Sequence, residues 1–478
     1  MNGLNDRLTV KAYITDELPA PHNNHARYLK DMLDDYRAYS GGYLHYEFID
    51  PARDDKEDET QGYRIPPLQF NVFRNDKTEF IKGYKGVVLL YGDRQEVIPY
   101  FENTSNLEYD LTRAMKKLTS IRTPSIGFTI GHGEPDMTAG FQTAYQILQE
   151  EYKVQFIDLM NVKAVPEQIE ALFVVAPKED FNEWELYLID QFVMRGGRVA
   201  FLLDRLEIDI AQGMVNEREN SLYDLMNSYG VGIEKQLVID ASCNMIPIMR
   251  DMGQFRMQST VKYPFYPAIT NFNNEIPIVK GLKRLNVLFM SPLDLNHMIA
   301  DGCDRQILFT SSEVSGIRSL PVDISPEKRY AESDFTKELV PLGAVLTGRF
   351  ESYFNDKDIP VYTGPDTLDT SPIPDKLSET QDSRMVVIGN GTFVTDDYRR
   401  NQTSFVVLMN TADWMTQEEG LISIRSKKMT ARALEVVSDG AKPVIKYINM
   451  FGMSVLVVLF GLIRWRVKRS TRKVREQI

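Results

Sequence analysis

The tetrapeptide Gly131-His132-Gly133-Glu134 is the part of this sequence whose residue types and spacing best suit chemistry. An imidazole and a carboxylate two positions apart can act as a general acid/base pair, and glycines let the backbone approach a bound group. Asp204, after the apolar run Phe201-Leu202-Leu203, is a second candidate for binding a ligand or partner. A structural interpretation stays open for both, as a tight strand-to-helix turn and as a helix cap.

Both candidates follow segments that are expected to be buried strands. The apolar run Ser125–Ile130 directly precedes the tetrapeptide, and Arg198–Leu203 directly precedes Asp204. Helical patterns at 138–151 and 182–195 alternate with these strands. Such alternation predicts a mainly parallel α/β sheet covered on both faces, which binds ligands at the carboxyl ends of its strands. We therefore expect the tetrapeptide and Asp204 to face the same crevice.

The remaining pattern extends this second α/β domain over residues 121–416. Aromatic and Pro-rich stretches at Cys243–Glu275 and Glu351–Asp382 indicate long loops or insertions. The other predicted elements are strands at 154–159, 172–176, 237–240, 287–290, 307–310 and 385–388, and helices at 221–229 and 403–416.

Residues 1–120 read as a separate domain. The pattern predicts strands at 8–14, 43–49, 68–73, 86–91 and 96–100, and helices at 23–39 and 107–118, with the acidic stretch Asp50–Glu59 as a solvated loop. This order resembles a thioredoxin-like domain. A redox motif would lie at the start of the first helix, where the sequence reads Leu18-Pro19-Ala20-Pro21-His22. Without a thiol there, no redox activity is expected.

Motifs for several enzyme classes are missing from the sequence. There is no phosphate-binding G-x-x-x-x-G-K-[ST] loop and no G-x-S-x-G nucleophile elbow. The five histidines are scattered, and His22 and His25 have no third ligand nearby, so neither a metal nor a cofactor is predicted. Cys243 and Cys303 can form one disulfide or remain two buried thiols. The sequence therefore predicts a protein that is not an enzyme.

The C-terminal residues predict a membrane anchor. The uncharged apolar run Tyr447–Ile463 spans roughly 25 Å as a helix, and Val444 with a snorkelling Lys446 extends it toward the bilayer thickness of about 30 Å. We place a basic connector at 417–442, a transmembrane helix at 443–463 and a cytoplasmic tail at 464–478. The tail is strongly basic, which favours the cytoplasmic side and contact with membrane lipid.

With this topology the chain is anchored in a bacterial inner membrane, and its body, residues 1–416, lies in the periplasm. The formal net charge of −12 over 478 residues argues against nucleic acid as a partner. The segment after Met1 contains no apolar signal core, so a first membrane helix upstream of this start is one alternative. A cytoplasmic, tail-anchored adaptor is the other.

Taken in order, these parts resemble the GldG family, the auxiliary extracytoplasmic subunits of gliding-motility-type ABC transporters. The resemblance rests on the thioredoxin-like unit, the strand entering Gly131–Glu134, the stretch Gly196–Asp204, the turn Leu225–Gly232 with Val238-Ile239-Asp240, and the membrane helix. It covers essentially the whole chain through the order of parts rather than any one motif. Members usually carry a membrane helix before the thioredoxin-like unit, and this sequence departs from them there.

The resemblance implies a partner permease, a separate ATPase and an origin in Bacteroidetes-type bacteria. It also implies that the second domain is similar to class I glutamine amidotransferases and to an intraflagellar transport subunit, without the amidotransferase cysteine. The leading hypothesis is a non-catalytic or substrate-binding transporter subunit, with a homodimer left open. The alternative is a membrane-anchored hydrolase or sugar-binding protein that uses the Gly131–Glu134 loop.

Overall fold

The computed structural model describes residues 6–416, with gaps at 17, 21, 75–76, 102–103, 105–106, 120–121, 137–138, 211, 253–254, 363, 366–371 and 399–401. The predicted connector, transmembrane helix and tail at 417–478 lie outside the described residues. Among the helices that are described, none is both long enough and apolar enough to cross a membrane.

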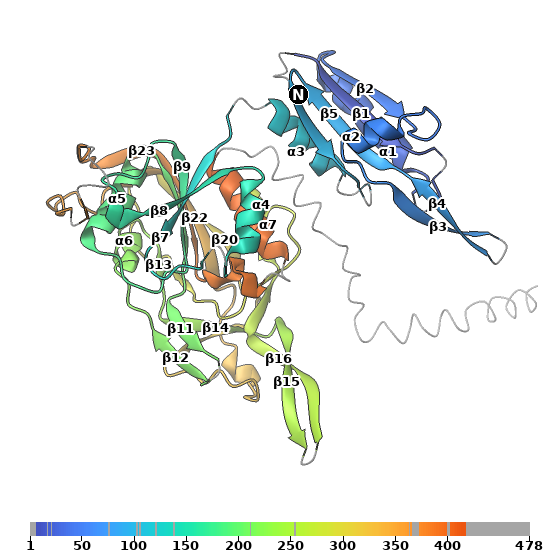
Figure 1. Ribbon diagram of the computed structural model, residues 1–478. Helices are drawn as coiled ribbons and strands as arrows, with labels where there is room; N and C mark the ends of the chain where they lie inside the picture. The colour runs from blue at the N-terminus through green and yellow to red at the C-terminus, as the bar shows by residue number, and fades with distance from the viewer. Residues whose placement is uncertain are drawn as a thin grey trace, which may run out of the picture. The chain divides into compact units, whose positions relative to one another are not determined.

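The N-terminal residues form a four-stranded sheet in the order β2-β1-β5-β6 (Figure 1). Strand β1 runs parallel to β2 and antiparallel to β5, which forms a hairpin with β6. One face of β1 packs Leu8, Val10 and Ala12 into the same apolar cluster as residues of α1 and α3. The elements of this sheet are β1 (Leu8–Ile14), α1 (His25–Tyr39), β2 (Leu44–Ile49), β5 (Lys85–Tyr91), β6 (Arg94–Ile98) and α3 (Leu107–Thr119).

Two further elements of this region differ from the sequence prediction. Strand β3 (Leu68–Arg74) pairs with β4 (Lys77–Gly83), which the pattern did not reveal, in a separate two-stranded sheet. The acidic stretch is not only loop, because α2 (Glu57–Gly62) begins inside it. The Glu59 carboxylate accepts hydrogen bonds from the hydroxyl of Tyr13 at 2.7 Å and from Nζ of Lys11 at 2.9 Å. This part of the acidic stretch is therefore fixed by long-range contacts that local charge does not predict.

A second, eight-stranded sheet has the order β17-β20-β22-β23-β10-β9-β7-β8. The strands from β23 to β8 run parallel, and β17, β20 and β22 are joined to them by antiparallel pairings. The sheet is thus mixed, and the prediction of a mainly parallel sheet holds for the five strands from β23 to β8. Its strands are β7 (Ser125–Ile130), β8 (Lys153–Asp158), β9 (Ile169–Val175), β10 (Arg198–Leu202), β17 (Asn271–Phe272), β20 (Cys303–Thr310), β22 (Pro341–Glu351) and β23 (Glu379–Ile388).

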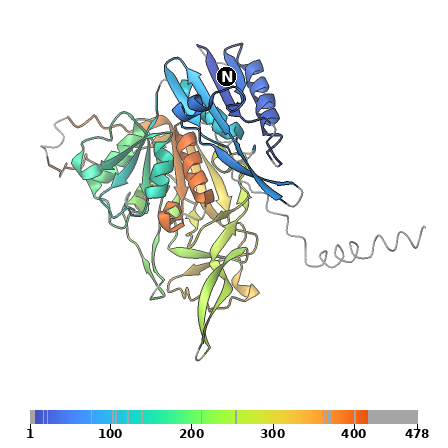
Figure 2. The same cartoon turned by 45° about the vertical axis from the view of Figure 1, so that its right-hand side comes forward.

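Helices cover both faces of this sheet (Figure 2). Side chains of β9 alternate: Phe173 and Val175 belong to the cluster that includes residues of α4 and α7, whereas Leu172 and Val174 belong to the cluster with α5 and α6. A strand that is buried on both faces has a continuous apolar sequence, which explains why β9 was predicted from the sequence. The helices are α4 (Gln142–Gln149), α5 (Glu183–Met194), α6 (Leu222–Ser228) and α7 (Gln402–Met415).

The segment Cys243–Glu275, expected to be a long loop, is mostly β structure. Strands β15 (Cys243–Met252) and β16 (Phe255–Ile269) form an antiparallel ribbon that projects away from the eight-stranded sheet (Figure 1). A two-stranded ribbon leaves both edges unpaired over much of its length, so its prolines interrupt no central ladder. Proline content was therefore a misleading loop signal here.

The predicted strand at 287–290 is also wrong. Phe289 has a φ of 58°, and its N–H donates to the carbonyl of Phe265 at 2.8 Å, so the chain turns instead of extending. The remaining strands are β11 (Leu206–Asp209), β12 (Met214–Glu217), β13 (Gly232–Ile233), β14 (Gln236–Asp240), β18 (Leu285–Asn286), β19 (Leu293–Asp294) and β21 (Ser315–Ser319). Short 3-10 helices lie at Leu159–Asn161, Pro277–Val279, Glu332–Asp334, Thr392–Val394 and Asp396–Tyr398.

Candidate functional site

A cleft of about 990 Å³ opens where four neighbouring parallel strands end. Glu134 follows β7, Lys178 follows β9, Asp204 follows β10 and Asn390 follows β23, and all four residues line it. The structure thus brings Gly133, Glu134 and Asp204 to the same cavity, as the strand-end argument expected. His132 does not line the cleft, and its side chain is 5% exposed.

The loop after β7 is a tight turn held by its own backbone. Gly131 and Gly133 have φ values of 111° and 72°, in the region that favours glycine. The His132 carbonyl accepts hydrogen bonds from the N–H groups of Lys178 at 2.7 Å and Glu179 at 2.9 Å. The His132 N–H in turn donates to Oε2 of Glu134 at 2.7 Å. This turn therefore ties the end of β7 to the end of β9.

The His132 side chain lies between two carboxylates. Its Nε2 atom is 3.0 Å from Oε1 of Glu185, and its Nδ1 atom is 3.5 Å from Oε1 of Glu134. Its ring stacks on Phe181 with the two centroids 3.7 Å apart. Glu185 lies in the first turn of α5, so the imidazole links the β7 loop to the start of that helix.

These neighbours control the protonation of His132. Burial favours the neutral imidazole, but the two carboxylates outweigh it and raise the pKa of His132 to about 9. The pKa of Glu134 is lowered. Burial alone would raise the pKa of this carboxyl, but the imidazolium of His132 and the backbone N–H groups together have the stronger effect and leave it below its usual range. At neutral pH His132 is therefore an imidazolium, with both ring nitrogens protonated, and it faces the Glu134 carboxylate.

Asp204 connects two strand ends. Its Oδ1 atom accepts a hydrogen bond from the N–H of Gly391 at 2.9 Å, and its carbonyl accepts one from the hydroxyl of Tyr223 at 3.1 Å. Burial raises the pKa of this carboxyl, and the Gly391 N–H and the charge of Arg218 partly offset that effect. Gly391 directly precedes the short 3-10 helix Thr392–Val394, so Asp204 contacts the start of a helix that is distant in sequence and not one that follows Asp204 in the chain.

Sequence reasoning missed the cationic residues of the cleft. Lys178, Arg205 and Arg218 line it together with Glu134 and Asp204. The Arg205 guanidinium stacks over the Tyr223 ring at 3.9 Å and pairs with Glu217 at 3.2 Å. No local motif marks these positions.

Glu185 was also missed, although a local signal for it existed. Asn182 and Glu185 form a capping box at the start of α5, with Asn182 Oδ1 accepting from the Glu185 N–H at 3.0 Å. The spacing N-x-x-E before an apolar run is the sequence signature of such a box. That signal would have located the helix start, but not its contact with His132.

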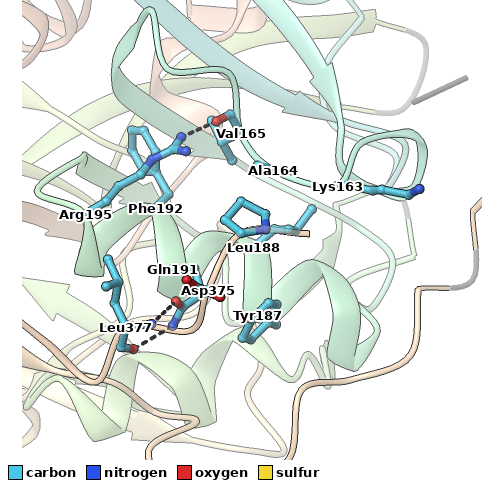
Figure 3. A pocket seen from close by; sticks show the side chains of 11 residues that line it. Lys163, Ala164, Val165, Tyr187, Leu188, Gln191, Phe192, Arg195, Asp375 and Leu377 are labelled. Atoms are coloured by element: carbon cyan, nitrogen blue, oxygen red, sulfur yellow. Dashed lines mark hydrogen bonds between the residues drawn. The ribbon is translucent and has the colours of Figure 1, made fainter. Parts of the chain in front are cut away.

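A second cavity, of about 50 Å³, lies between α5 and residues 374–377 (Figure 3). Gln191 spans its edge, donating from Nε2 to the Leu377 carbonyl at 3.0 Å and accepting at Oε1 from the Leu377 N–H at 2.7 Å. A cavity of this size holds one or two water molecules at most. We therefore treat it as a packing feature rather than a ligand site.

Within the residues that the structure describes, no cluster of three or more His, Cys, Asp or Glu side chains is arranged to hold a metal ion. Cys243 and Cys303 are both free thiols of intermediate exposure, so they neither form a disulfide nor are fully buried. Burial raises the pKa of each thiol, which disfavours the reactive thiolate.

Comparison with known proteins adds several similarities. A relative from Borreliella burgdorferi, described as an uncharacterized protein, is 22% identical over 422 residues, which cover 85% of this chain and 78% of the relative. Among solved structures, the mmIFT52 N-terminal domain is 12% identical, with a TM-score of 0.37, and covers 61% of this chain and 97% of that one. A putative ThuA-like protein from Parabacteroides merdae is 11% identical, with a TM-score of 0.29, over 61% and 90% of the two chains.

Two protein families match the sequence directly. Residues 1–89 match a domain of unknown function. Residues 123–417, which contain the eight-stranded sheet and the whole cleft, match the auxiliary family described as an ABC-type uncharacterized transport system. Because this second match spans more than half of the sequence, the chain belongs to the auxiliary family of ABC-type transport systems.

Proposed function

We propose that this auxiliary transport protein is a non-catalytic binding subunit, which holds a ligand or partner in the cleft and associates with a permease and a separate ATPase. Family membership supports association with ABC transporter components. The absence of a phosphate-binding loop from the sequence agrees with an ATPase on another chain.

The protonation of His132 is the observation that carries the non-catalytic part of the proposal. A general base needs an unprotonated nitrogen within reach of the substrate. The His132 imidazole is buried, lies outside the cleft lining and holds its proton up to a pKa of about 9. Glu134, its sequence partner, already accepts the His132 N–H. This arrangement supports a role for both groups in holding the loop beside the cleft, and not a role in acting on a substrate.

The finer identity is also a proposal. The order β2-β1-β5-β6, with a parallel pair, an antiparallel hairpin and a following helix, supports a thioredoxin-like N-terminal domain. The sequence resemblance to the GldG family supports a link to gliding motility. An inner-membrane anchor through 443–463, with the body in the periplasm, follows from the apolar run and basic tail of the sequence.

Affinity purification tests this function. The full-length chain, tagged and extracted in mild detergent, is expected to recover a polytopic permease and a nucleotide-binding subunit. The matched control deletes residues 443–478 and keeps the body intact. Recovery of neither transporter component with the full chain would refute the proposal.

One observation favours the alternative of a hydrolase or sugar-binding protein. Asp204 lines the cleft and has a raised pKa, which suits a general acid. The discriminating experiment compares the wild-type protein with Asp204→Asn on a panel of ester and glycoside substrates. Turnover that depends on Asp204 would favour the hydrolase, and absence of turnover with intact transporter association favours the binding subunit.

A further inference from the structure

The short strand β11 runs along the wall of the cleft. Four successive residues, Arg205, Leu206, Glu207 and Ile208, line the cavity. Successive side chains of a strand point to opposite faces, so a cavity on one face would contact every second residue. A cavity that contacts consecutive residues therefore lies along the edge of the strand. β11 pairs with β12 on one side, and no other described strand pairs with it on the other.

The register of this pair shows which backbone groups lie on the open edge. The Arg218 N–H donates to the Arg205 carbonyl at 3.1 Å, so these two residues form a hydrogen-bonded pair. Hydrogen-bonded and non-hydrogen-bonded pairs alternate in an antiparallel ladder. The amides and carbonyls of Leu206 and Ile208 therefore point away from β12. Outside the β11–β12 ladder, neither amide donates to the backbone of another described residue.

An apolar cavity continues the cleft beyond the end of β11. It has a volume of about 480 Å³ and shares Ile210, Leu288 and Phe289 with the cleft lining. Ile246, Tyr263, Ile324 and Pro326 contribute further apolar lining. Ile210 is 64% exposed at the junction of the two cavities. The two cavities thus adjoin each other at three shared lining residues, close to the β11 edge.

The backbone at this junction is strained and held in place. Phe289 has a φ of 58° without being glycine. The Asn390 side chain donates from Nδ2 to the carbonyls of Leu288 at 3.0 Å and Phe289 at 3.2 Å. A non-glycine residue stays in this region only when its surroundings impose it, and such strain concentrates at ligand-binding sites. The end of β23 therefore shapes the junction where the cleft and the apolar cavity adjoin.

We propose that the open edge of β11 binds an extended polypeptide segment of a partner protein by strand addition. The backbone groups of Leu206 and Ile208 that point away from β12 supply main-chain hydrogen bonds to the added strand. Apolar side chains of that segment enter the cavity beyond Ile210. Glu207 projects to the opposite face from Leu206 and Ile208, so a basic side chain placed across from it is favoured. The segment thus alternates apolar and basic residues, and this inference rests on the cleft being a binding site.

Peptide binding to the purified full-length protein in detergent tests the inference. The probe is a dye-labelled nonapeptide in which valine and lysine alternate, followed by fluorescence anisotropy. Two further probes carry N-methyl groups on either the odd or the even backbone amides. Strand addition predicts that one methylation pattern weakens binding tenfold or more and that the other has little effect, because only alternate amides face β11. Equal effects of both patterns, or no binding of the parent peptide, would overturn it.

A pair of proline substitutions provides the matched control on the protein. Ile208→Pro removes an open-edge N–H without removing a bond to β12 and is expected to weaken peptide binding tenfold or more. Val215, its cross-strand partner in β12, has the equivalent position on the far edge of the pair. Val215→Pro should leave binding unchanged at the same melting temperature. If both variants bind like the wild type, the β11 edge is not the site.

The two proposals can fail separately. A chain that recovers no permease but binds the nonapeptide with the alternating methylation pattern refutes the transporter role and keeps the strand-addition site. A chain that recovers the permease and ATPase but binds the methylated probes equally, or only a small solute, refutes strand addition and keeps the auxiliary function.

Discussion

The Nε2 atom of His132 lies 3.0 Å from Oε1 of Glu185, which joins the loop at the cleft wall to the first turn of α5. The same carboxylate accepts the Asn182 N–H at Oε2, at 2.9 Å. One buried side chain therefore caps a helix and compensates the charge of an imidazolium. Both the backbone of the loop Gly131–Glu134 and the side chain of His132 are thus held by contacts with residues outside the loop.

His132→Ala is expected to lower the free energy of unfolding by about 3–5 kcal/mol, because it leaves the buried carboxylates of Glu134 and Glu185 without a counter-charge. Urea denaturation measures the change. The control is His297→Ala, since the His297 side chain is 33% exposed and pairs with Asp294 at 3.3 Å. That control should cost less than about 1 kcal/mol. Equal losses for the two variants would contradict the role given to His132.

His132 also predicts how stability falls at alkaline pH. Its pKa is about 9 in the folded protein and about 6.5 in the unfolded chain, so the folded state binds more protons between these values. The resulting stability is fully present below pH 6.5 and is lost as pH rises through about 9. Denaturation of wild type and His132→Gln across pH 6–10 checks this. Parallel curves for the two proteins would show that the imidazolium contributes nothing.

His25, in α1, predicts the opposite dependence at acid pH. Burial, with the nearby charges of Lys85 and His22, lowers the pKa of His25 to about 4. The unfolded chain therefore binds more protons between pH 4 and about 6.5, and stability falls as pH decreases through that window. NMR titration of the imidazole gives the pKa directly. His25→Gln is expected to flatten the slope of stability between pH 4 and 6.5, whereas an unchanged slope would point to another group.

Gly391→Ala is expected to destabilise the protein by about 1–3 kcal/mol through overpacking. A Cβ atom at this position would lie 2.7 Å from the Ala176 amide nitrogen and would collide with the Leu202 carbonyl. The Gly391 N–H also donates to Asp204, so the cleft should be distorted. Gly62→Ala is the control, because a Cβ there would meet no atom within 4 Å. Calorimetric melting of both variants should show a loss only for Gly391→Ala.

Gln191→Ala is expected to release residues 374–377 from α5, because the two hydrogen bonds to Leu377 shown in Figure 3 are lost. Hydrogen exchange at the Leu377 amide should accelerate by tenfold or more, which corresponds to about 1.4 kcal/mol for one such contact. Gln381→Ala, which removes an exposed side-chain bond to Glu379, is the control. Unchanged exchange at Leu377 in both variants would mean that packing alone holds the segment.

The parallel half of the large sheet was predictable from local pattern. Ser125–Ile130 and Arg198–Leu203 are apolar over consecutive residues because their strands are buried on both faces. Their alternation with helices implies right-handed crossovers and places all strand ends on one edge. For this reason the positions of Glu134 and Asp204 could be related before any coordinates were known.

The β15–β16 ribbon was not predictable in the same way. Its strands are rich in proline and aromatic residues, and its stability depends on pairing between two segments rather than on the period of either one. The open edge of β11 was hidden for the same reason. A strand's edge is free or paired according to what the rest of the chain places beside it.

The sequence by itself determined the alternation of strands and helices in the parallel part of the large sheet, the strand ends there that carry polar residues and the lack of familiar catalytic motifs, because these depend on local periodicity and residue type. Only the tertiary structure decided that His132 is an enclosed imidazolium, that Lys178, Arg205 and Arg218 enter the cleft, and that an apolar cavity continues it past Ile210. Those features arise from side chains distant in sequence, whose burial and charge have meaning only once the chain has brought them together.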